Sequence, residues 1–360
     1  MTKTYIIAEA GVNHNGSIKS AFKLIDEAVK CGADAVKFQT FKSENLVTPN
    51  AKKVNYQKKF SPHQDNQLQM LKNLEISYDE FVRISNYCIT KNIDFLSTAF
   101  DDDSLNFLYK KIKLKTFKIS SGDITNGPFL LSHARKKCKI ILSTGMSNIS
   151  EIESALGVIA YGMLNAKKTN KKISLNKFKQ AFKDKKGKLI LKKNVSLLHC
   201  TSEYPTPYEE VNLLSIRTLQ KKFNLDIGYS DHTSGITAAI IATTLGAKII
   251  EKHITLNKKQ LGPDHKSSLE PHEFKEMVNQ IRITEKCLGN GKKKPTKSEI
   301  KNMSSIRKTL VAKSNIKKGE KFSLNNIDIK RSKLNKSPMD YWKLIDKKSN
   351  RAYKIDDIIK

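Results

Sequence analysis

The chain has 360 residues, 38% of them hydrophobic and 28% charged, and its formal net charge is +31. This length suits about two domains with packed cores, and the sequence lacks the ~18-residue apolar run of a membrane span, so we expect no membrane association. The five cysteines are scattered without a C-x-x-C pair, which excludes a disulfide scaffold and a cysteine zinc site and predicts a cytoplasmic protein.

Short apolar runs alternate with amphipathic stretches along most of the chain. We expect strands at residues 5–10, 35–39, 93–99, 116–120, 139–144, 195–200, 226–231 and 249–253. We expect helices at residues 18–30, 78–91, 149–161 and 235–245, among others. Ser17, Ser77, Asp102 and Ser147 are candidate N-caps, because their side chains can accept a hydrogen bond from the first helical turn.

Eight strands alternating with helices predict an α/β protein with a (β/α)8 TIM barrel over residues 1–288. The alternative is an open doubly wound sheet, which would need a glycine-rich phosphate loop, and the chain has no G-x-G-x-x-G segment. Residues 289–303 contain a polar stretch with glycine and proline and are expected to be a linker. Residues 304–360 are expected to form a small β-rich domain that docks on a barrel, since so short a chain is marginal alone.

A lysine-rich tract interrupts the barrel between residues 167 and 193. It contains twelve lysines against one acid, Asp184, a net charge of +11. We interpret it as an insertion on the outside of the barrel, with solvated lysines or with lysines that steer an anionic substrate. Nucleic-acid binding is the third interpretation, but the tract has little arginine and few interleaved aromatics, so we expect no nucleic-acid partner.

Polar side chains end every predicted strand. In a TIM barrel the active site lies at these C-terminal ends. Lysines supply charge and hydroxyls supply hydrogen bonds, a combination that suits a phosphorylated or carboxylated substrate. The candidate residues at these ends are Glu9, Lys37, Gln39, Thr98, Lys118, Ser121, Ser143, Ser202, Tyr204 and Ser230.

Two histidines, His232 and His253, end the last two predicted strands. Two imidazoles on neighbouring strands can share a metal ion. With no cysteine alongside, a labile divalent ion with open coordination positions is expected rather than a closed zinc site. Three other histidines compete for this role, namely His14, His199 and His265. Asp264 follows the turn-forming Gly-Pro pair of the last loop, which is expected to present it to the mouth.

The sequence resembles the sialic acid synthase family, which comprises N-acetylneuraminate synthase and its close relatives for legionaminic acid. The resemblance runs from about residue 4 to the C-terminus, and the tail is similar to the family's antifreeze-like (SAF) domain. Many motifs in family order make it highly specific. They are AEAGVNHNG, GADAVKFQTFK, FLSTAFD, FKISSGDITN, ILSTGM, HCTSEYPTPYEEVNL, GYSDHTSG, IEKHITL and GPDHKSSLEP.

The resemblance implies a transferase of cell-surface carbohydrate biosynthesis. It would condense phosphoenolpyruvate, an N-acetylated mannosamine and water into N-acetylneuraminate and phosphate. The alternative is an N,N'-diacetyllegionaminate synthase that uses 2,4-diacetamido-2,4,6-trideoxymannose. In this family C3 of phosphoenolpyruvate attacks the open-chain aldehyde, water adds at C2, and phosphate leaves by C–O cleavage. A remote alternative is a non-catalytic basic binding protein on a barrel scaffold.

The resemblance also implies roles for individual residues. His232 and His253 should hold the divalent metal, Mn²⁺ or Mg²⁺, and Glu9 and Asp123 should be catalytic. Arg331, near the C-terminus, should reach the sugar's N-acetyl group from the partner protomer of a domain-swapped homodimer. The remaining substrate contacts should come from Lys37, Gln39, Thr98, Lys118, Ser121, Ser143, Ser202, Tyr204, Ser230 and Asp264.

Some positions depart from the family's usual pattern. Asp123 stands where the family has a glutamate, so its carboxylate is one methylene shorter and its reach differs by about a bond length. Ser332 follows Arg331 where a proline would stiffen the loop. No metal ligand or phosphate-binding lysine is lost, so we expect the activity to be retained.

Overall fold

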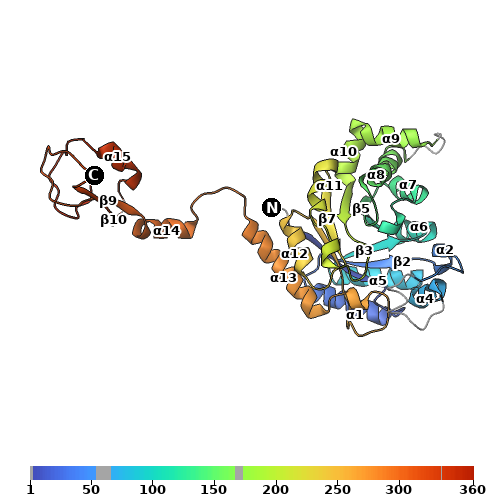
Figure 1. Ribbon diagram of the computed structural model, residues 1–360. Helices are drawn as coiled ribbons and strands as arrows, with labels where there is room; N and C mark the ends of the chain where they lie inside the picture. Colours follow the sequence, from blue (N-terminus) through green and yellow to red (C-terminus); the bar gives the residue numbers. More distant parts are fainter. Residues whose placement is uncertain (1–2, 54–65, 167–172, 334) are drawn as a thin grey trace. The chain divides into compact units, whose positions relative to one another are not determined.

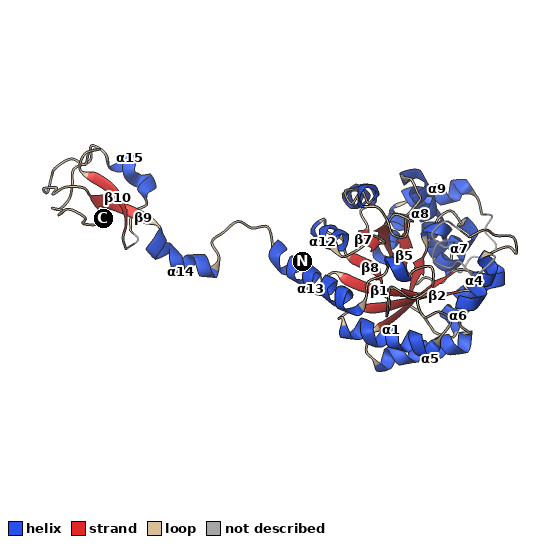
Figure 2. Ribbon diagram, turned by 60° about the horizontal axis from the view of Figure 1, so that its bottom comes forward, coloured by secondary structure: helices blue, strands red, loops and turns tan. Residues whose placement is uncertain are grey.

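The computed structural model describes residues 3–53, 66–166, 173–333 and 335–360. The chain forms two compact units, Met1–Gly289 and Asn290–Lys360. In the first unit the strands form a central barrel with helices around it (Figure 1, Figure 2). No helix among the described residues is long and apolar enough to traverse a lipid bilayer.

The first unit is a closed barrel in which every neighbouring pair of strands is parallel, in the order β1-β2-β3-β4-β5-β6-β7-β8. The predicted (β/α)8 fold is therefore confirmed, and the open-sheet alternative is wrong. The strands are β1 (Tyr5–Gly11), β2 (Ala35–Thr40), β3 (Asp94–Ala99), β4 (Thr116–Ile119), β5 (Lys139–Ser143), β6 (Val195–His199), β7 (Asp226–Asp231) and β8 (Ile249–His253).

Helices surround the barrel and connect its strands. They are α1 (Ile18–Lys30), α2 (Ser43–Leu46), α4 (Gln67–Leu74), α5 (Tyr78–Thr90), α6 (Asp102–Lys110), α7 (Gly127–Arg135), α8 (Ile149–Leu164), α9 (Leu175–Lys183), α10 (Lys185–Asn194), α11 (Ser215–Phe223), α12 (Thr237–Thr244) and α13 (Pro271–Leu288). The helices pack apolar faces on the sheet, and their contacts with the outer side of the strands form the largest buried hydrophobic cluster.

Local capping explains where several helices begin. Ser17 and Ser77 cap α1 and α5 as predicted. Two predicted caps are displaced by one residue, since Asp101 caps α6 and Asn148 caps α8. Asp101 takes the role because its carboxylate accepts hydrogen bonds from both the backbone and the hydroxyl of Ser104, each at 2.7 Å.

The interior of the barrel is apolar at one end and polar at the other. Ile7, Leu96, Ile141 and Ile249 form a buried cluster inside the barrel with Ala35 and Leu198. Two residues further along four of these strands come Glu9, Thr98, Ser143 and Glu251. Side chains at i and i+2 of a strand share a face. Each of these strands therefore places an apolar layer inside the barrel, below the polar side chain at its C-terminal end. The sequence pattern thus positions a polar site on a rigid base.

The lysine-rich tract is not a loop in its described part. Residues 167–172 lie outside the described residues, and the rest of the tract forms α9 and α10, which pack on α8. Gly157 of α8 permits this approach, because a Cβ there would lie 2.8 Å from the carbonyl oxygen of Phe178. Lysines of both helices face solvent while Ala181 and Leu191 are buried.

The second unit has its own small core. It contains α14 (Lys297–Ile306), the antiparallel pair β9 (Lys308–Ala312) and β10 (Ile327–Arg331), and α15 (Tyr341–Leu344). Leu310, Ile316, Phe322 and Tyr353 are among its buried residues. The predicted small β-rich module is therefore present. Helix α14 begins inside residues 289–303, which were expected to be a linker, because Thr296 and Glu299 form a capping box.

Candidate active site

A cavity of about 440 Å³ opens at the C-terminal ends of the barrel strands. Its lining includes every predicted site residue of the first unit except Asp123. These are Glu9, Lys37, Gln39, Thr98, Lys118, Ser121, Ser143, Ser202, Tyr204, Ser230, His232, His253 and Asp264. Residues from all eight strand ends or the loops after them therefore converge on one space, as the barrel topology requires.

Buried charges occupy the floor of this cavity. The Lys37 ammonium lies 2.5 Å from the Glu9 carboxylate and 3.7 Å from that of Glu251. The Lys118 ammonium lies 3.4 Å from Glu251. All four side chains are at most 5% exposed. Each charge is compensated, as burial demands, but the two lysines share one carboxylate, that of Glu251.

Sequence reasoning missed Glu251 as a site residue. Its Oε1 accepts a hydrogen bond from the Ser230 hydroxyl at 2.8 Å, and it lies between the two lysines. Glu251 precedes His253 by two residues on β8, so both side chains point to the same face. That spacing in IEKH was the available signal, because it places any side chain at 251 beside a residue already assigned to the site.

Burial and neighbouring charges shift the pKa values of the three cavity carboxyls in different directions. Burial raises the pKa of Glu9, and the Lys37 ammonium opposes this only in part. Burial also acts on Glu251, but the ammoniums of Lys118 and Lys37 outweigh it and lower its pKa. Burial raises the pKa of Asp264 to about 6. Glu251 is therefore the permanent counter-charge, while Glu9 and Asp264 can exchange protons near neutral pH.

Small polar groups form a cradle where β4, β5 and β6 end. The backbone N–H of Gly145 donates to Ser121 Oγ at 3.0 Å, and Ser121 Oγ lies 3.2 Å from Cys200 Sγ. A Cβ on Gly145 would lie 2.5 Å from Ser202 Oγ, so a larger residue would displace the side chains of the cradle. The Ser143 hydroxyl is buried and has no hydrogen-bond partner within the described part of the chain. An unpaired buried hydroxyl in the same cavity as two buried lysines indicates a place for an anionic ligand.

The two predicted metal histidines face one another. Their ring centroids are 5.7 Å apart, and the Tyr204 ring packs against both. His232 Nδ1 donates to the carbonyl oxygen of Thr201 at 2.7 Å, which leaves the lone pair on Nε2. His253 Nδ1 is buried, makes no hydrogen bond within the described residues, and lies 3.8 Å from Asp264 Oδ2.

This arrangement fits a divalent cation with open positions. Burial lowers the pKa of His232 to about 4 and lowers the pKa of His253 well below its usual value, so both imidazoles are neutral, the form that binds metal. Among the described residues no three His, Cys, Asp or Glu side chains gather as a complete ligand set. Two imidazoles, one with an unpartnered nitrogen, match an ion whose remaining ligands are water and substrate oxygens.

Several candidate residues lie elsewhere. Asp123 follows β4 and accepts a hydrogen bond from Ser120 Oγ at 2.7 Å, outside the cavity lining. Arg331 ends β10 in the second unit and is exposed. The three competing histidines do not line the cavity. His199 contacts the Val211 carbonyl, and His265 contacts Thr255 and Asn15. His14 accepts the Gly16 N–H at 3.0 Å.

One part of the cavity is apolar. We call it the apolar wall, and it consists of Val12, Leu46, Val47, Met70, Leu71, Leu74 and Phe100. Most of it comes from α2, the residue after α2, and α4. These residues form a hydrophobic cluster of their own with Phe41, separate from the barrel core. The cavity therefore offers a charged floor and a hydrophobic side to one ligand.

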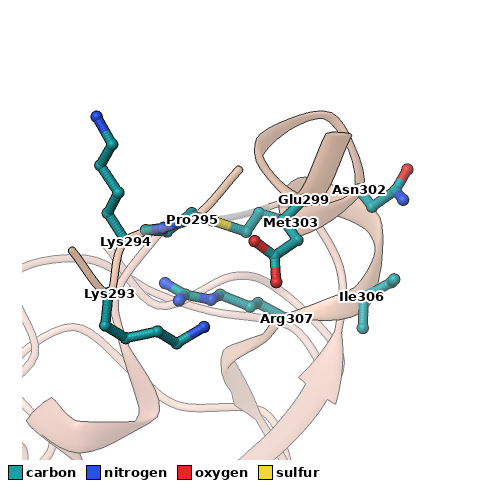
Figure 3. Close-up of a pocket in the computed structure, with 8 residues that line it drawn as sticks. All are labelled: Lys293, Lys294, Pro295, Glu299, Asn302, Met303, Ile306 and Arg307. Carbon is teal, nitrogen blue, oxygen red and sulfur yellow. The ribbon is translucent and has the colours of Figure 1, made fainter. Parts of the chain in front are cut away.

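The second unit has a surface cavity of about 460 Å³ beside α14. Figure 3 shows the side chains that line it, with three cations and one carboxylate among them. They are Lys293, Lys294, Pro295, Glu299, Asn302, Met303, Ile306 and Arg307. It holds no predicted site residue and nearly all of its lining is exposed, so the barrel cavity is the candidate active site.

Comparison with known proteins agrees with this geometry. The protein-family model described as the NeuB family matches residues 24–293. The chain is 46% identical to an N,N'-diacetyllegionaminic acid synthase of Campylobacter jejuni over the full length of both chains. It is 40% identical to the synthase of that name from Legionella pneumophila, over 90% of this chain and 84% of that protein. The crystal structure of an N-acetylneuraminic acid synthetase from Leptospira borgpetersenii, in complex with citrate, superposes with a TM-score of 0.66 at 34% identity, covering 85% of this chain and 93% of that one.

Proposed function

The chain belongs to the NeuB family of phosphoenolpyruvate-dependent nonulosonic acid synthases, and we propose that it makes N,N'-diacetyllegionaminate. The sequence motifs alone favoured N-acetylneuraminate as the product. The two legionaminic acid synthases at 46% and 40% identity favour the alternative, against 34% for the N-acetylneuraminic acid synthetase. The remote alternative of a non-catalytic binding protein gains no support from these relatives.

The apolar wall is the structural observation that supports this acceptor. N-acetylmannosamine carries hydroxyls at C4 and C6, whereas 2,4-diacetamido-2,4,6-trideoxymannose carries an acetamido group and a methyl there. The side chains of Met70, Leu71 and Leu74 form a buried apolar surface that accepts a methyl group, although Gln67 of the same helix also lines the cavity. A hydroxyl buried against this wall without a partner costs about 1–3 kcal/mol, a penalty that the methyl group of the deoxy sugar does not incur.

The charged floor suits phosphoenolpyruvate. We assign its carboxylate and phosphate to the ammoniums of Lys37 and Lys118, together with the hydroxyls of the Gly145 cradle and of Ser143. Before binding, Glu251 compensates both lysines at distances beyond a short ion pair. A bound anion therefore gains the Lys118 ammonium, which has no short ion pair, and the already desolvated Lys37 ammonium, which Glu9 holds at 2.5 Å.

The reaction needs proton handling beside the anion site, and we assign it to Glu9. The C3–C1 bond forms between phosphoenolpyruvate and the aldehyde, water adds to C2, and the C2–O bond to phosphate breaks. Glu9 lies 2.5 Å from Lys37, and its raised pKa suits a carboxylate that accepts a proton from the attacking water. Lys37 holds the Glu9 carboxylate in place.

His232 and His253 would hold a divalent cation, Mn²⁺ or Mg²⁺, beside this pocket. Such an ion supplies Lewis-acid polarisation of the acceptor's aldehyde oxygen. Tyr204 packs against both rings and limits their rotation. Asp264, whose carboxylate lies 3.8 Å from His253, is assigned to a sugar hydroxyl.

Arg331 and the domain-swapped dimer belong to the same proposal. Arg331 is exposed at the end of β10, so its guanidinium is accessible to a ligand on a partner protomer. Mixing Arg331→Ala subunits with Lys118→Ala subunits should restore part of the activity, because each heterodimer regains one site with both residues. Heterodimers that form but stay inactive would refute the swap.

A competition assay tests the proposed acceptor. Purified protein, Mn²⁺ and phosphoenolpyruvate are mixed with both acceptors, and the two nonulosonic acids are separated and quantified. A site that places the C6 group against the apolar wall should prefer the trideoxy sugar by about 10-fold or more in kcat/KM. Equal use of both sugars, or preference for N-acetylmannosamine, would overturn the assignment without affecting family membership.

A further inference from the structure

Each of the two metal histidines follows a residue of one buried ion pair. Asp231 precedes His232 at the end of β7, and Lys252 precedes His253 on β8. Lys252 Nζ lies 2.9 Å from Asp231 Oδ2, and both side chains are 0% exposed. Asp231 and Lys252 are register partners in the sheet. Because successive strand residues point to opposite faces, the ion pair lies behind the sheet while the imidazoles face the cavity.

The ion pair also holds the backbone on both sides of His232. Asp231 Oδ1 accepts hydrogen bonds from the Thr233 N–H at 2.9 Å and from the Thr233 hydroxyl at 2.8 Å. Lys252 Nζ donates to the Thr233 carbonyl oxygen at 2.6 Å. Thr233 is thus tied to both strands. The pair therefore fixes the turn that carries one imidazole to the strand that carries the other.

Packing alone does not require charges at these positions. Helix α12 packs on β7 and β8 with alanines facing inward, and the surrounding layer is largely apolar. Replacement of a buried ion pair by hydrophobic residues of similar volume is often neutral or stabilising, whereas removal of one partner is strongly destabilising. The Asp231–Lys252 pair in this apolar layer is therefore better explained by the backbone geometry that it fixes than by a contribution to the stability of the fold.

We propose that Asp231 and Lys252 are positioning residues that set the separation and orientation of the His232 and His253 imidazoles. This inference rests on the proposed metal role of the two histidines. Neither residue lines the cavity, so neither touches substrate. Loss of the pair should leave the anion pocket intact and weaken metal binding, because partners behind metal ligands typically contribute about 10- to 100-fold to affinity.

The test measures Mn²⁺ affinity of the metal-free full-length protein by calorimetry, together with unfolding in guanidinium chloride. Asp231→Leu/Lys252→Met removes both charges and keeps an apolar layer. Asp231→Asn/Lys252→Met is the milder variant if the first double variant fails to fold, because it also removes both charges but keeps an acceptor for Thr233. Thr243→Val alters another buried polar side chain, on α12, and serves as the matched control.

We expect a double variant that folds to bind Mn²⁺ at least tenfold more weakly than the parent, and the denaturant midpoint shows that the protein measured is folded. The KM for phosphoenolpyruvate should change less than twofold, and Thr243→Val should bind Mn²⁺ as the parent does. Folded variants with parental Mn²⁺ affinity would overturn the positioning role alone. A parent that binds no Mn²⁺, or binds it equally after His232→Ala, would overturn the metal assignment and this inference with it.

Discussion

The Lys37 ammonium and the Glu9 carboxylate lie 2.5 Å apart at the base of the barrel cavity, and both are shielded from solvent. They come from adjacent strands, β1 and β2, where Glu9 and Lys37 are register partners. A β-bulge follows at Gly11, whose positive φ of 51° lets the chain turn beside the Glu9 carboxylate. The buried Lys37 ammonium thus holds the buried Glu9 carboxylate in a fixed position at the strand ends.

Glu9→Gln should lower kcat by about 10²- to 10⁴-fold, because it removes a general base while preserving shape and hydrogen-bond capacity. The affinity for phosphoenolpyruvate should stay within a few-fold of the parent. Steady-state kinetics with phosphate release, and calorimetry with phosphoenolpyruvate, provide the two measurements. A variant that keeps more than a tenth of the parent kcat would remove Glu9 from the chemistry.

The acid side of the pH profile should report the raised pKa of Glu9. The working form is the ionised carboxylate, so kcat/KM should fall as pH falls through that pKa, above the ordinary glutamate value of about 4.3. Burial lowers the pKa of His232 to about 4, so protonation of this imidazole does not explain a loss at higher pH.

The pH profile of the residual activity of Glu9→Gln shows whether Glu9 or another group causes the loss of activity at low pH. In that variant the acid limb should disappear. An unchanged midpoint would assign the limb to another group, and Asp264, whose pKa burial raises to about 6, is the next candidate.

Gly145→Ala should raise the KM for phosphoenolpyruvate at least tenfold. Its Cβ would come within 2.5 Å of Ser202 Oγ and 2.8 Å of Ser121 Oγ, so the cradle must open. Gly127→Ala is the matched control, since a Cβ there meets nothing within 4 Å. Saturation curves for both variants at fixed acceptor concentration give the comparison. Equal KM values would show that the cradle does not hold the anion.

Leu71→Gln should lower the preference for the trideoxy acceptor over N-acetylmannosamine by about tenfold, because a polar amide replaces part of the apolar wall. Leu131→Gln is the matched control. Leu71 and Leu131 are 9% and 8% exposed, but Leu131 lies on α7 and does not line the cavity. The ratio of kcat/KM values for the two acceptors is insensitive to a general loss of folded protein. A parental ratio in Leu71→Gln would exclude the wall from acceptor choice.

Much of the barrel and its site could be predicted because both follow from strand periodicity. Apolar runs mark the strands, and the topology brings every strand's C-terminal end to one place, so Glu9, Lys118 and His253 converge although they are far apart in sequence. Motif resemblance then supplied roles that spacing does not. The displaced caps at Asp101 and Asn148 show the usual uncertainty of one residue at helix ends.

Other features depend on tertiary contacts that no local pattern specifies. Glu251 becomes a site residue only because β8 closes against β1 and places it between two lysines from other strands. The apolar wall assembles from Val12, α2 with the residue after it, α4 and Phe100, which belong to different loops and helices. Leucines at these positions look like ordinary core residues in the sequence. Asp123 carried a family role, but its local hydrogen bond to Ser120 holds it outside the cavity lining.

The location of metal and anion tests the central claim most directly. Crystals grown with Mn²⁺ and phosphoenolpyruvate, measured at a wavelength where manganese scatters anomalously, show where both bind. We predict a single strong anomalous peak at coordination distance from one nitrogen each of His232 and His253, with the phosphate against Lys118 and Ser143. An anomalous peak elsewhere, or phosphoenolpyruvate bound away from the Lys37–Glu251–Lys118 cluster, would contradict the account.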